Sequence, residues 1–370
     1  MPKLLTRYFV KELILYYFVS FLFFFMIFFV NQILLMIQDV LKQRVPVGTV
    51  LLLMLYCLPF VISQAAPFAT LVGFLMCIAR MVTDNEMLVL RALGISFLKL
   101  LVPVLVVGAF ISVFSFAVND FLFPRGALAY NKLYRDILIS NPAVELEPNS
   151  IKRTQDSILV TGNIENNQIS DLIYFDHDLK GNQRVIVCND AKVAQATNAQ
   201  VLMQINMKNA KIFIPQNEDF NSIDFISSES TILNIFSNNF FGNRYNGLNP
   251  QEMTSYDLGN YIKELKSDPN QSRQYINIFE VEYMRKFALP FSSIFFAFLA
   301  FPLAVIFGKH NGQTVGFIVG VVICVAYWSL QSVGQVLGQR NGFSSFWGMW
   351  LPNFILAAVG LFFYARMRRT

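Results

Sequence analysis

The sequence has little of what disulfide-rich proteins and metalloproteins need. It contains four cysteines and two histidines in 370 residues. Three of the cysteines lie in apolar runs, so Cys188, which lies in a polar region, has no evident partner and no disulfide framework is expected. With His177 and His310 as its only histidines, the sequence argues against a histidine-based metal site.

Motifs for nucleotide binding and catalysis are also missing. The sequence has no Gly-x-x-x-x-Gly-Lys-Ser/Thr stretch, which excludes ATP binding of the P-loop type. It shows neither a paired-carboxylate site nor a Ser/His/Asp set, so we expect no catalytic site, no metal site and no cofactor in this chain. Acidic residues that relay protons are largely absent from the apolar runs, which argues against a proton-coupled transporter.

Long apolar runs dominate what is present. Hydrophobic residues make up 55% of the chain, charged residues 14%, and the mean hydropathy is +0.47. Runs of about 20 apolar residues match the thickness of a bilayer core. We expect six membrane spans, at about residues 13–37, 50–79, 97–123, 281–307, 314–337 and 346–364.

A polar region separates the third and fourth spans. Its short alternating segments predict strands at residues 157–161, 172–175, 184–187, 201–207, 210–214, 222–226 and 231–236. This pattern favours an antiparallel sandwich or jelly roll. The expected fold is an α-helical membrane protein with six transmembrane helices and an inserted all-β, jelly-roll-like domain. The expected domains are residues 1–125 with spans one to three, 126–268 with the β insertion, and 269–370 with spans four to six.

A soluble helix is expected after the strands. Thr254 can cap it and Asp257 can reach back, as in a capping box. Leu258, Ile262 and Leu265 recur on one face, so this helix should pack on another element.

The net charge of +5 comes largely from Lys and Arg at span ends, which indicates orientation in a membrane and gives no support for nucleic acid as a partner. The basic N-terminus, Arg80, Arg91, Lys99, Lys309 and the C-terminal arginines fall on one side of a six-span arrangement. The positive-inside rule makes that side cytoplasmic. Both termini are then cytoplasmic, and the β insertion is exported, into the periplasm of a bacterium with two membranes.

The segment from Arg80 to Ile95 is a polar link between spans two and three, on the cytoplasmic side. Thr83, Asp84 or Asn85 can cap a short helix, and Gly94 is placed to end it. It is either an ordinary interfacial turn or a helix, at residues 81–95, that docks on a cytosolic partner.

Several motifs, in this order, resemble the lipopolysaccharide export permeases of the LptF/LptG (YjgP/YjgQ) type over essentially the whole chain. They are Arg7-Tyr8, Asp84-Asn85-Glu86, Arg91-Ala92-Leu93-Gly94-Ile95-Ser96, Met253-Thr254, Tyr283-Met284-Arg285-Lys286-Phe287-Ala288-Leu289-Pro290, Pro302-Leu303-Ala304 and Trp350-Leu351-Pro352-Asn353. The arrangement of three spans, a β-rich insertion and three more spans is similar too. The length of the insertion and the motifs fit the F and the G paralogue equally.

The resemblance implies a subunit of the bacterial inner membrane that pairs with a paralogous permease as a heterodimer. A cytosolic ABC ATPase dimer would supply ATP and Mg²⁺ chemistry. The pair would extract lipopolysaccharide and pass it to a periplasmic bridge protein of the LptC/LptA type. The segment between spans two and three corresponds to the family's coupling helix, whose acidic residue matches Glu86. The candidate ATPase-coupling residues are Asp84, Glu86, Leu90, Arg91 and Leu93.

Basic residues near the outer ends of the spans are the candidate lipid-binding residues: Lys42, Arg44, Arg285 and Lys286. They either anchor the helices at the interface or contact lipid phosphates, for which Arg and Lys are suited. Polar residues inside the spans either line a cavity or form hydrogen bonds between helices; they are Asn31, Gln32, Gln64 and Gln331.

Three functions remain possible from the sequence. The first is an ATP-driven lipid extraction permease. The second is a force-transmitting membrane subunit that moves no lipid itself and acts on envelope partners. The third is a secondary transporter or channel, against which the scarcity of intramembrane acids argues.

Overall fold

The computed structural model describes residues 3–40, 46–140, 148–153, 157–165, 168–177, 183–195, 201–215, 223–236, 249–269, 271–308, 312–340 and 343–369. The chain divides into two compact units. One unit contains residues 1–35, 54–128 and 250–370, and the other contains residues 36–53 and 129–249.

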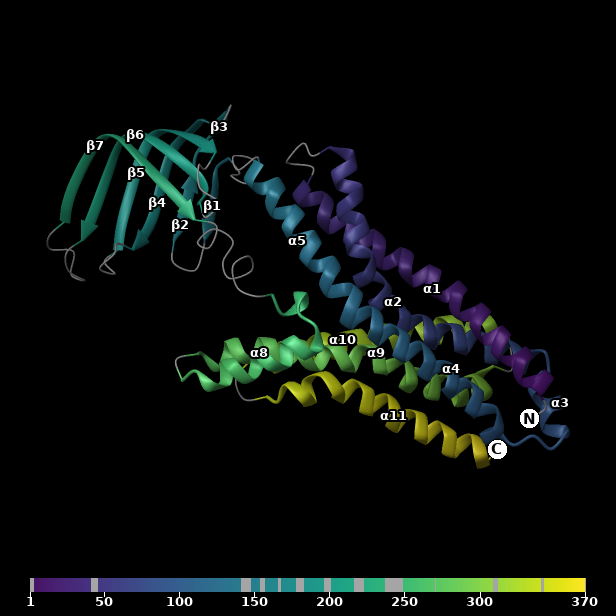
Figure 1. The fold of residues 1–370 in the computed structure, drawn as a ribbon. Helices are drawn as coiled ribbons and strands as arrows, with labels where there is room; N and C mark the ends of the chain where they lie inside the picture. The colour runs from purple at the N-terminus through teal and green to yellow at the C-terminus, as the bar shows by residue number, and fades with distance from the viewer. Residues whose placement is uncertain are drawn as a thin grey trace. The chain divides into compact units, whose positions relative to one another are not determined.

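Among the residues that the structure describes, six helices are long and apolar enough to cross a membrane, which confirms the six-span prediction (Figure 1). The first two are α1 (Lys3–Val40) and α2 (Val47–Thr83). The third begins as α4 (Phe97–Ala117), and the last three are α9 (Arg273–Phe307), α10 (Gly312–Gln339) and α11 (Ser345–Arg369).

The third span continues well beyond Phe123, where the apolar run was expected to end. A π-helical segment (Val118–Leu122) follows α4, and α5 (Phe123–Ser140) follows without interruption. Pro124 has no backbone N–H for the carbonyl of Asp120, and the N–H of Phe123 bonds to the carbonyl of Val118, one residue further back than in an α-helix. The widened turn lets the chain stay helical past the proline.

Large aromatic side chains fill the interior of the helical unit. Phe68, Phe74, Phe296 and Tyr327 are almost fully buried, and Phe296 and Tyr327 meet edge to face with ring centroids 4.9 Å apart. Exposed aliphatic and aromatic side chains cover the outside of α1 and α10. Helices that are apolar on all faces fit a lipid environment.

The soluble helix expected after the strands is α8 (Ser255–Ser267), preceded by a short 3-10 turn (Pro250–Glu252). The side-chain oxygen of Thr254 accepts a hydrogen bond from the Asp257 N–H and donates one to the Asp257 carboxylate, which confirms the predicted cap. The predicted apolar face is also confirmed: Leu258, Ile262 and Leu265 are buried against Phe279 of α9.

The inserted β domain is one curved antiparallel sheet among the residues that the structure describes (Figure 1). The strand order is β1-β2-β4-β5-β6-β7, with β3 paired to β4. The strands are β1 (Ser150–Arg153), β2 (Ile158–Thr161), β3 (Ile164–Glu165), β4 (Gln168–His177), β5 (Gln183–Gln195), β6 (Val201–Pro215) and β7 (Ile223–Phe236).

The last two strands are longer than the sequence pattern predicts. The segments expected at 201–207 and 210–214 form the single strand β6, and those at 222–226 and 231–236 form β7. Asn209 takes a left-handed φ of 53°, yet β6 pairs with β7 on both sides of it, at Lys208↔Ser230 and Ala210↔Ser228. One face of the sheet carries the core, which includes Leu172, Ile205 and Met207.

Candidate functional site

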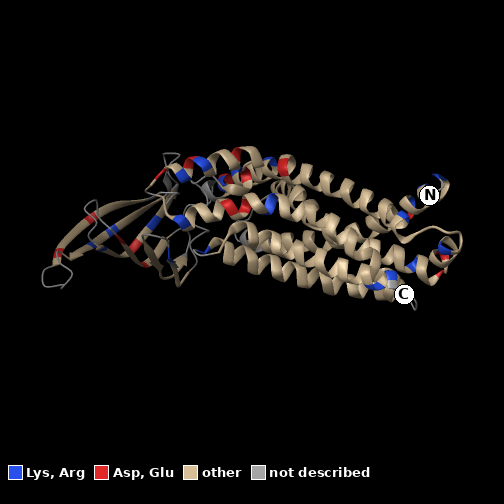
Figure 2. Cartoon of the chain, turned by 90° about the horizontal axis from the view of Figure 1, so that it is seen from below, with Lys and Arg blue, Asp and Glu red and all other residues tan. Residues whose placement is uncertain are grey.

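Both chain termini and α3 (Glu86–Ala92) lie at the same end of the helical bundle (Figure 1). Figure 2 shows charged residues gathered at this end and at the opposite end of the bundle, with an almost uncharged stretch between them. The termini and the segment 80–95 were predicted to share one side of the membrane, and this arrangement supports that prediction. We call this end the inner end and the opposite end the outer end.

Helix α3 is short and has a well-defined stop. Gly94 adopts a φ of +79°; its N–H bonds to the carbonyl of Arg91, and the N–H of Ile95 bonds to that of Leu90. This is a Schellman motif, so the predicted stop at Gly94 is confirmed. The start differs from the prediction: Asn85 precedes the helix in a left-handed conformation, with φ 60°, and its side chain makes no capping hydrogen bond.

The two faces of α3 have different environments. Met87 and Leu90 are buried in the core of the helical unit, whereas Leu88, Val89 and Leu93 are exposed. Of the two leucines among the candidate ATPase-coupling residues, Leu93 is exposed and Leu90 packs inside its own chain. Leu88 and Val89 were not among the candidates. They are exposed because Met87 and Leu90 occupy the buried face of α3.

The charged candidates of this segment contact neighbouring elements. The Asp84 carboxylate lies 4.0 Å from a guanidinium nitrogen of Arg80, and Tyr8 of α1 donates a hydrogen bond of 3.2 Å to Glu86. The Arg91 guanidinium lies over the Phe97 ring, 4.3 Å from its centroid. Helix α3 therefore carries one acidic side chain, Glu86, and one basic side chain, Arg91, beside its exposed apolar face.

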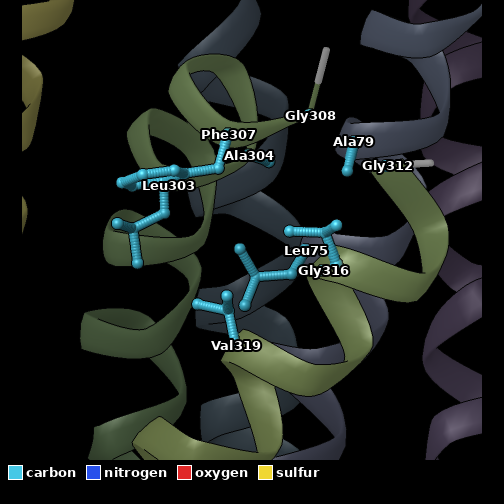
Figure 3. A pocket seen from close by; sticks show the side chains of 10 residues that line it. Leu75, Ala79, Leu303, Ala304, Phe307, Gly308, Gly312, Gly316 and Val319 are labelled. Atoms are coloured by element: carbon cyan, nitrogen blue, oxygen red, sulfur yellow. The ribbon is translucent and has the colours of Figure 1, made fainter. Parts of the chain in front are cut away.

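The end of α9 and the start of α10 both bond to Thr83, at the end of α2. The Thr83 hydroxyl donates to the Gly308 carbonyl at 2.7 Å and accepts from the Gly312 N–H at 3.2 Å. A small apolar pocket lies beside this contact (Figure 3), lined by Leu75, Ala79, Leu303, Ala304, Phe307, Gly308, Gly312, Val315, Gly316 and Val319. None of the lining residues that the structure describes is charged.

The four candidate lipid-binding residues differ in their surroundings and in whether the structure describes them. Lys42 and Arg44 lie outside the described residues. Arg285 is partly exposed and lies 3.4 Å from Glu282 on the preceding turn of α9. Lys286 is only 1% exposed, and its amine makes no hydrogen bond to any residue that the structure describes; the Phe123 ring lies 6.0 Å away.

Asp120 and Asn119, in the π-helical segment, are the residues that the sequence reasoning missed at the outer end. Asp120 is buried and accepts hydrogen bonds from the backbone N–H of Ser255 at 2.6 Å and from its hydroxyl at 3.0 Å. Asn119 donates to the Lys286 carbonyl at 3.1 Å, a group left without its helical partner by Pro290. The sequence does contain a signal for this site. Asp120 is an acidic residue in an apolar run, close to the helix-breaking Pro124, and a buried carboxylate needs a hydrogen-bond partner.

Two of the four polar candidates inside the spans, Gln32 and Gln331, contact other helices. Gln32 of α1 approaches the Cys57 sulfur at 3.9 Å, and Gln331 of α10 approaches the Met349 sulfur at 3.7 Å. Asn353 joins two helices: it accepts from the Tyr327 hydroxyl at 3.0 Å and donates to the Ala288 carbonyl at 2.8 Å. These contacts fit the reading of such residues as interhelical partners.

Two comparisons with known proteins complete the description. A family model described as "Lipopolysaccharide export system permease LptF/LptG" matches residues 7–366. No curated protein matches the chain.

Proposed function

Because the chain belongs to the lipopolysaccharide export permease LptF/LptG family, we propose that it is one permease subunit of an ATP-driven extractor of lipopolysaccharide. The subunit forms a heterodimer with a paralogous permease in a bacterial inner membrane. A cytosolic ABC ATPase dimer holds ATP and Mg²⁺, and a periplasmic bridge protein of the LptC/LptA type receives the lipid. The inner end of the bundle is cytoplasmic, and the inserted sheet is periplasmic.

The exposed face of α3 is the observation that supports the ATP-driven reading. Leu88, Val89 and Leu93 form an apolar surface beside Glu86 and Arg91, at the end of the bundle that holds both termini. An apolar face flanked by opposite charges is suited to a partner's groove. Since the chain carries no P-loop motif, the work of ATP hydrolysis has to enter through such a surface.

On the lipid side, Arg285 is the first candidate for phosphate contact. Its guanidinium is partly exposed and only loosely paired with Glu282, at 3.4 Å. Buried Lys286 can contact a phosphate only if the outer end of the bundle opens. In this proposal Arg285 meets the lipid first and Lys286 contributes after opening.

The test is purification of the tagged full chain, expressed with its paralogue and ATPase, in mild detergent. We expect both the ATPase and lipopolysaccharide, identified by mass spectrometry of its lipid A, in the purified complex. Recovery of the ATPase without lipid would favour the force-transmitting subunit. Recovery of neither would contradict the proposal.

The first prediction concerns Glu86. Glu86→Lys should weaken ATPase co-purification by more than tenfold, because removing one partner of a desolvated interface charge pair commonly costs about 2–5 kcal/mol. Glu264→Lys is the matched control, since Glu264 is an exposed residue of α8 at the outer end. Normal ATPase recovery with Glu86→Lys would remove Glu86 from the docking surface.

A further inference from the structure

Three polar side chains lie along one face of the inner part of α1. Tyr8, Glu12 and Tyr16 are spaced four residues apart, so they stack on one side of the helix. Each contacts a different element: Tyr8 bonds to Glu86 of α3, Glu12 to Arg80 of α2, and Tyr16 to Gln313 of α10. The polar face therefore joins α1 to three other elements at the inner end.

Arg80 is the centre of this arrangement. One of its terminal nitrogens lies 3.0 Å from the Glu12 carboxylate and donates to the Tyr8 hydroxyl at 3.5 Å. Its guanidinium carbon lies 5.7 Å from the centroid of the Tyr16 ring. The rigid fork of an arginine can hold several partners at fixed angles, so Arg80 fixes where the Tyr8 hydroxyl lies.

Helix α3 cannot fix the direction of Glu86 by itself. It has seven residues, too few to be stable alone, and Asn85 supplies no side-chain cap. The inward packing of Met87 and Leu90 sets the axis and the face of the helix. Among the described residues, the hydrogen bonds found for the Glu86 side chain come from Tyr8, at 3.2 Å to one carboxylate oxygen and 3.5 Å to the other.

We infer that Tyr8 is a positioning residue for Glu86, and that it makes α3 and the inner end of α1 move as one body. The hydroxyl is held by Arg80 on one side and donates its proton to the carboxylate on the other. The carboxylate keeps lone pairs free for a cation of the ATPase. This inference rests on the proposed function, because it assigns a path by which force on α3 reaches the first span.

The test compares matched variants of the complete permease–ATPase complex in proteoliposomes. Tyr8→Phe removes one hydroxyl and keeps the ring; Tyr16→Phe makes the same change eight residues further on and leaves Glu86 untouched. The readout is lipopolysaccharide transferred per ATP hydrolysed, at saturating ATPase. We expect Tyr8→Phe to lower this ratio by about two- to tenfold, which is the fold-change that the free energy of one hydrogen bond corresponds to. Tyr16→Phe should leave the ratio unchanged.

A double-mutant cycle separates positioning from general damage. If Tyr8 acts through Glu86, adding Tyr8→Phe to Glu86→Ala causes no further loss, whereas additive losses would overturn the inference. If Glu86→Ala lowers the ratio but Tyr8→Phe matches Tyr16→Phe, the inference alone fails. If Glu86→Ala leaves the ratio unchanged, the coupling role of Glu86 fails and the inference falls with it.

Discussion

A buried carboxylate, that of Asp120, lies at the start of α8. Asp120 accepts both the backbone N–H and the hydroxyl of Ser255, the first residue of α8. The first N–H groups of a helix lack intrahelical partners, and the helix dipole favours a negative charge there. Asp120 thus fixes the segment that follows the sheet to the third span.

Removing this carboxylate should loosen α8. Asp120→Ala loses two charge-assisted hydrogen bonds, each worth about 1.5–3 kcal/mol. We expect amide hydrogen exchange across Leu258–Leu265 to become more than tenfold faster in the detergent-solubilised protein.

Asp257→Ala is the matched control, because it removes an exposed acid from the same helix start. Its effect should stay below about 1 kcal/mol, with little change in exchange. Equal acceleration in both variants would show that Asp120 contributes no more than an ordinary cap.

At the level of elements, helix α10 approaches α2 through glycines. A Cβ at Gly312 would lie 2.4 Å from the Ala79 carbonyl oxygen and 2.5 Å from the Thr83 hydroxyl; at Gly316 it would lie 3.1 Å from the backbone of Leu75. Backbone atoms cannot move aside as a flexible side chain can. The close approach is what allows Thr83 to bond to both Gly308 and Gly312.

Gly312→Ala should therefore separate these elements. We expect a loss of stability of about 1–3 kcal/mol from overpacking, seen as a lower midpoint of thermal unfolding in detergent. Gly48→Ala is the control, because a Cβ at Gly48 of α2 meets nothing within 4 Å. Alanine is the better helix former by about 1 kcal/mol, so this variant should unfold at the same temperature or higher. A Gly312→Ala protein as stable as Gly48→Ala would contradict the packing described here.

Local patterns predicted most of the elements. Apolar runs located the six spans, and Thr254 with Asp257 located the start of α8, because each of these signals is contained within a few turns of chain. The prediction divided β6 into segments 201–207 and 210–214, whereas the strand pairing continues through Asn209, which has a positive φ. The helix of the third span is also longer than the apolar run in the sequence, because a π-helical turn accommodates Pro124.

The contacts of the candidate sites could not be predicted from local patterns. Asp120 and Ser255 are 135 residues apart, and Tyr8 and Glu86 are 78 apart. The sequence identified Glu86 and Lys286 through motifs, yet only tertiary packing shows that Lys286 is buried and that Leu90 faces inward. The exposure of a side chain depends on which helices lie next to it. A helix that is apolar on all faces gives little indication in its sequence of which helices those are.

At the scale of the whole molecule, the two ends of the bundle have to lie on opposite sides of the membrane. The positive-inside rule predicts that Arg80, Arg91 and both termini lie in the cytoplasm, and six spans then predict that the inserted sheet lies outside. All four native cysteines are buried, so the chain offers a low background for thiol labelling. Single cysteines can be introduced at Asp84, next to α3, and at exposed Glu229 in β7. With an impermeant thiol reagent on cells whose outer membrane has been made permeable, Glu229→Cys should label at once, and Asp84→Cys only after the inner membrane is broken. Labelling of Asp84→Cys but not of Glu229→Cys would reverse the orientation and remove α3 from any contact with a cytosolic ATPase.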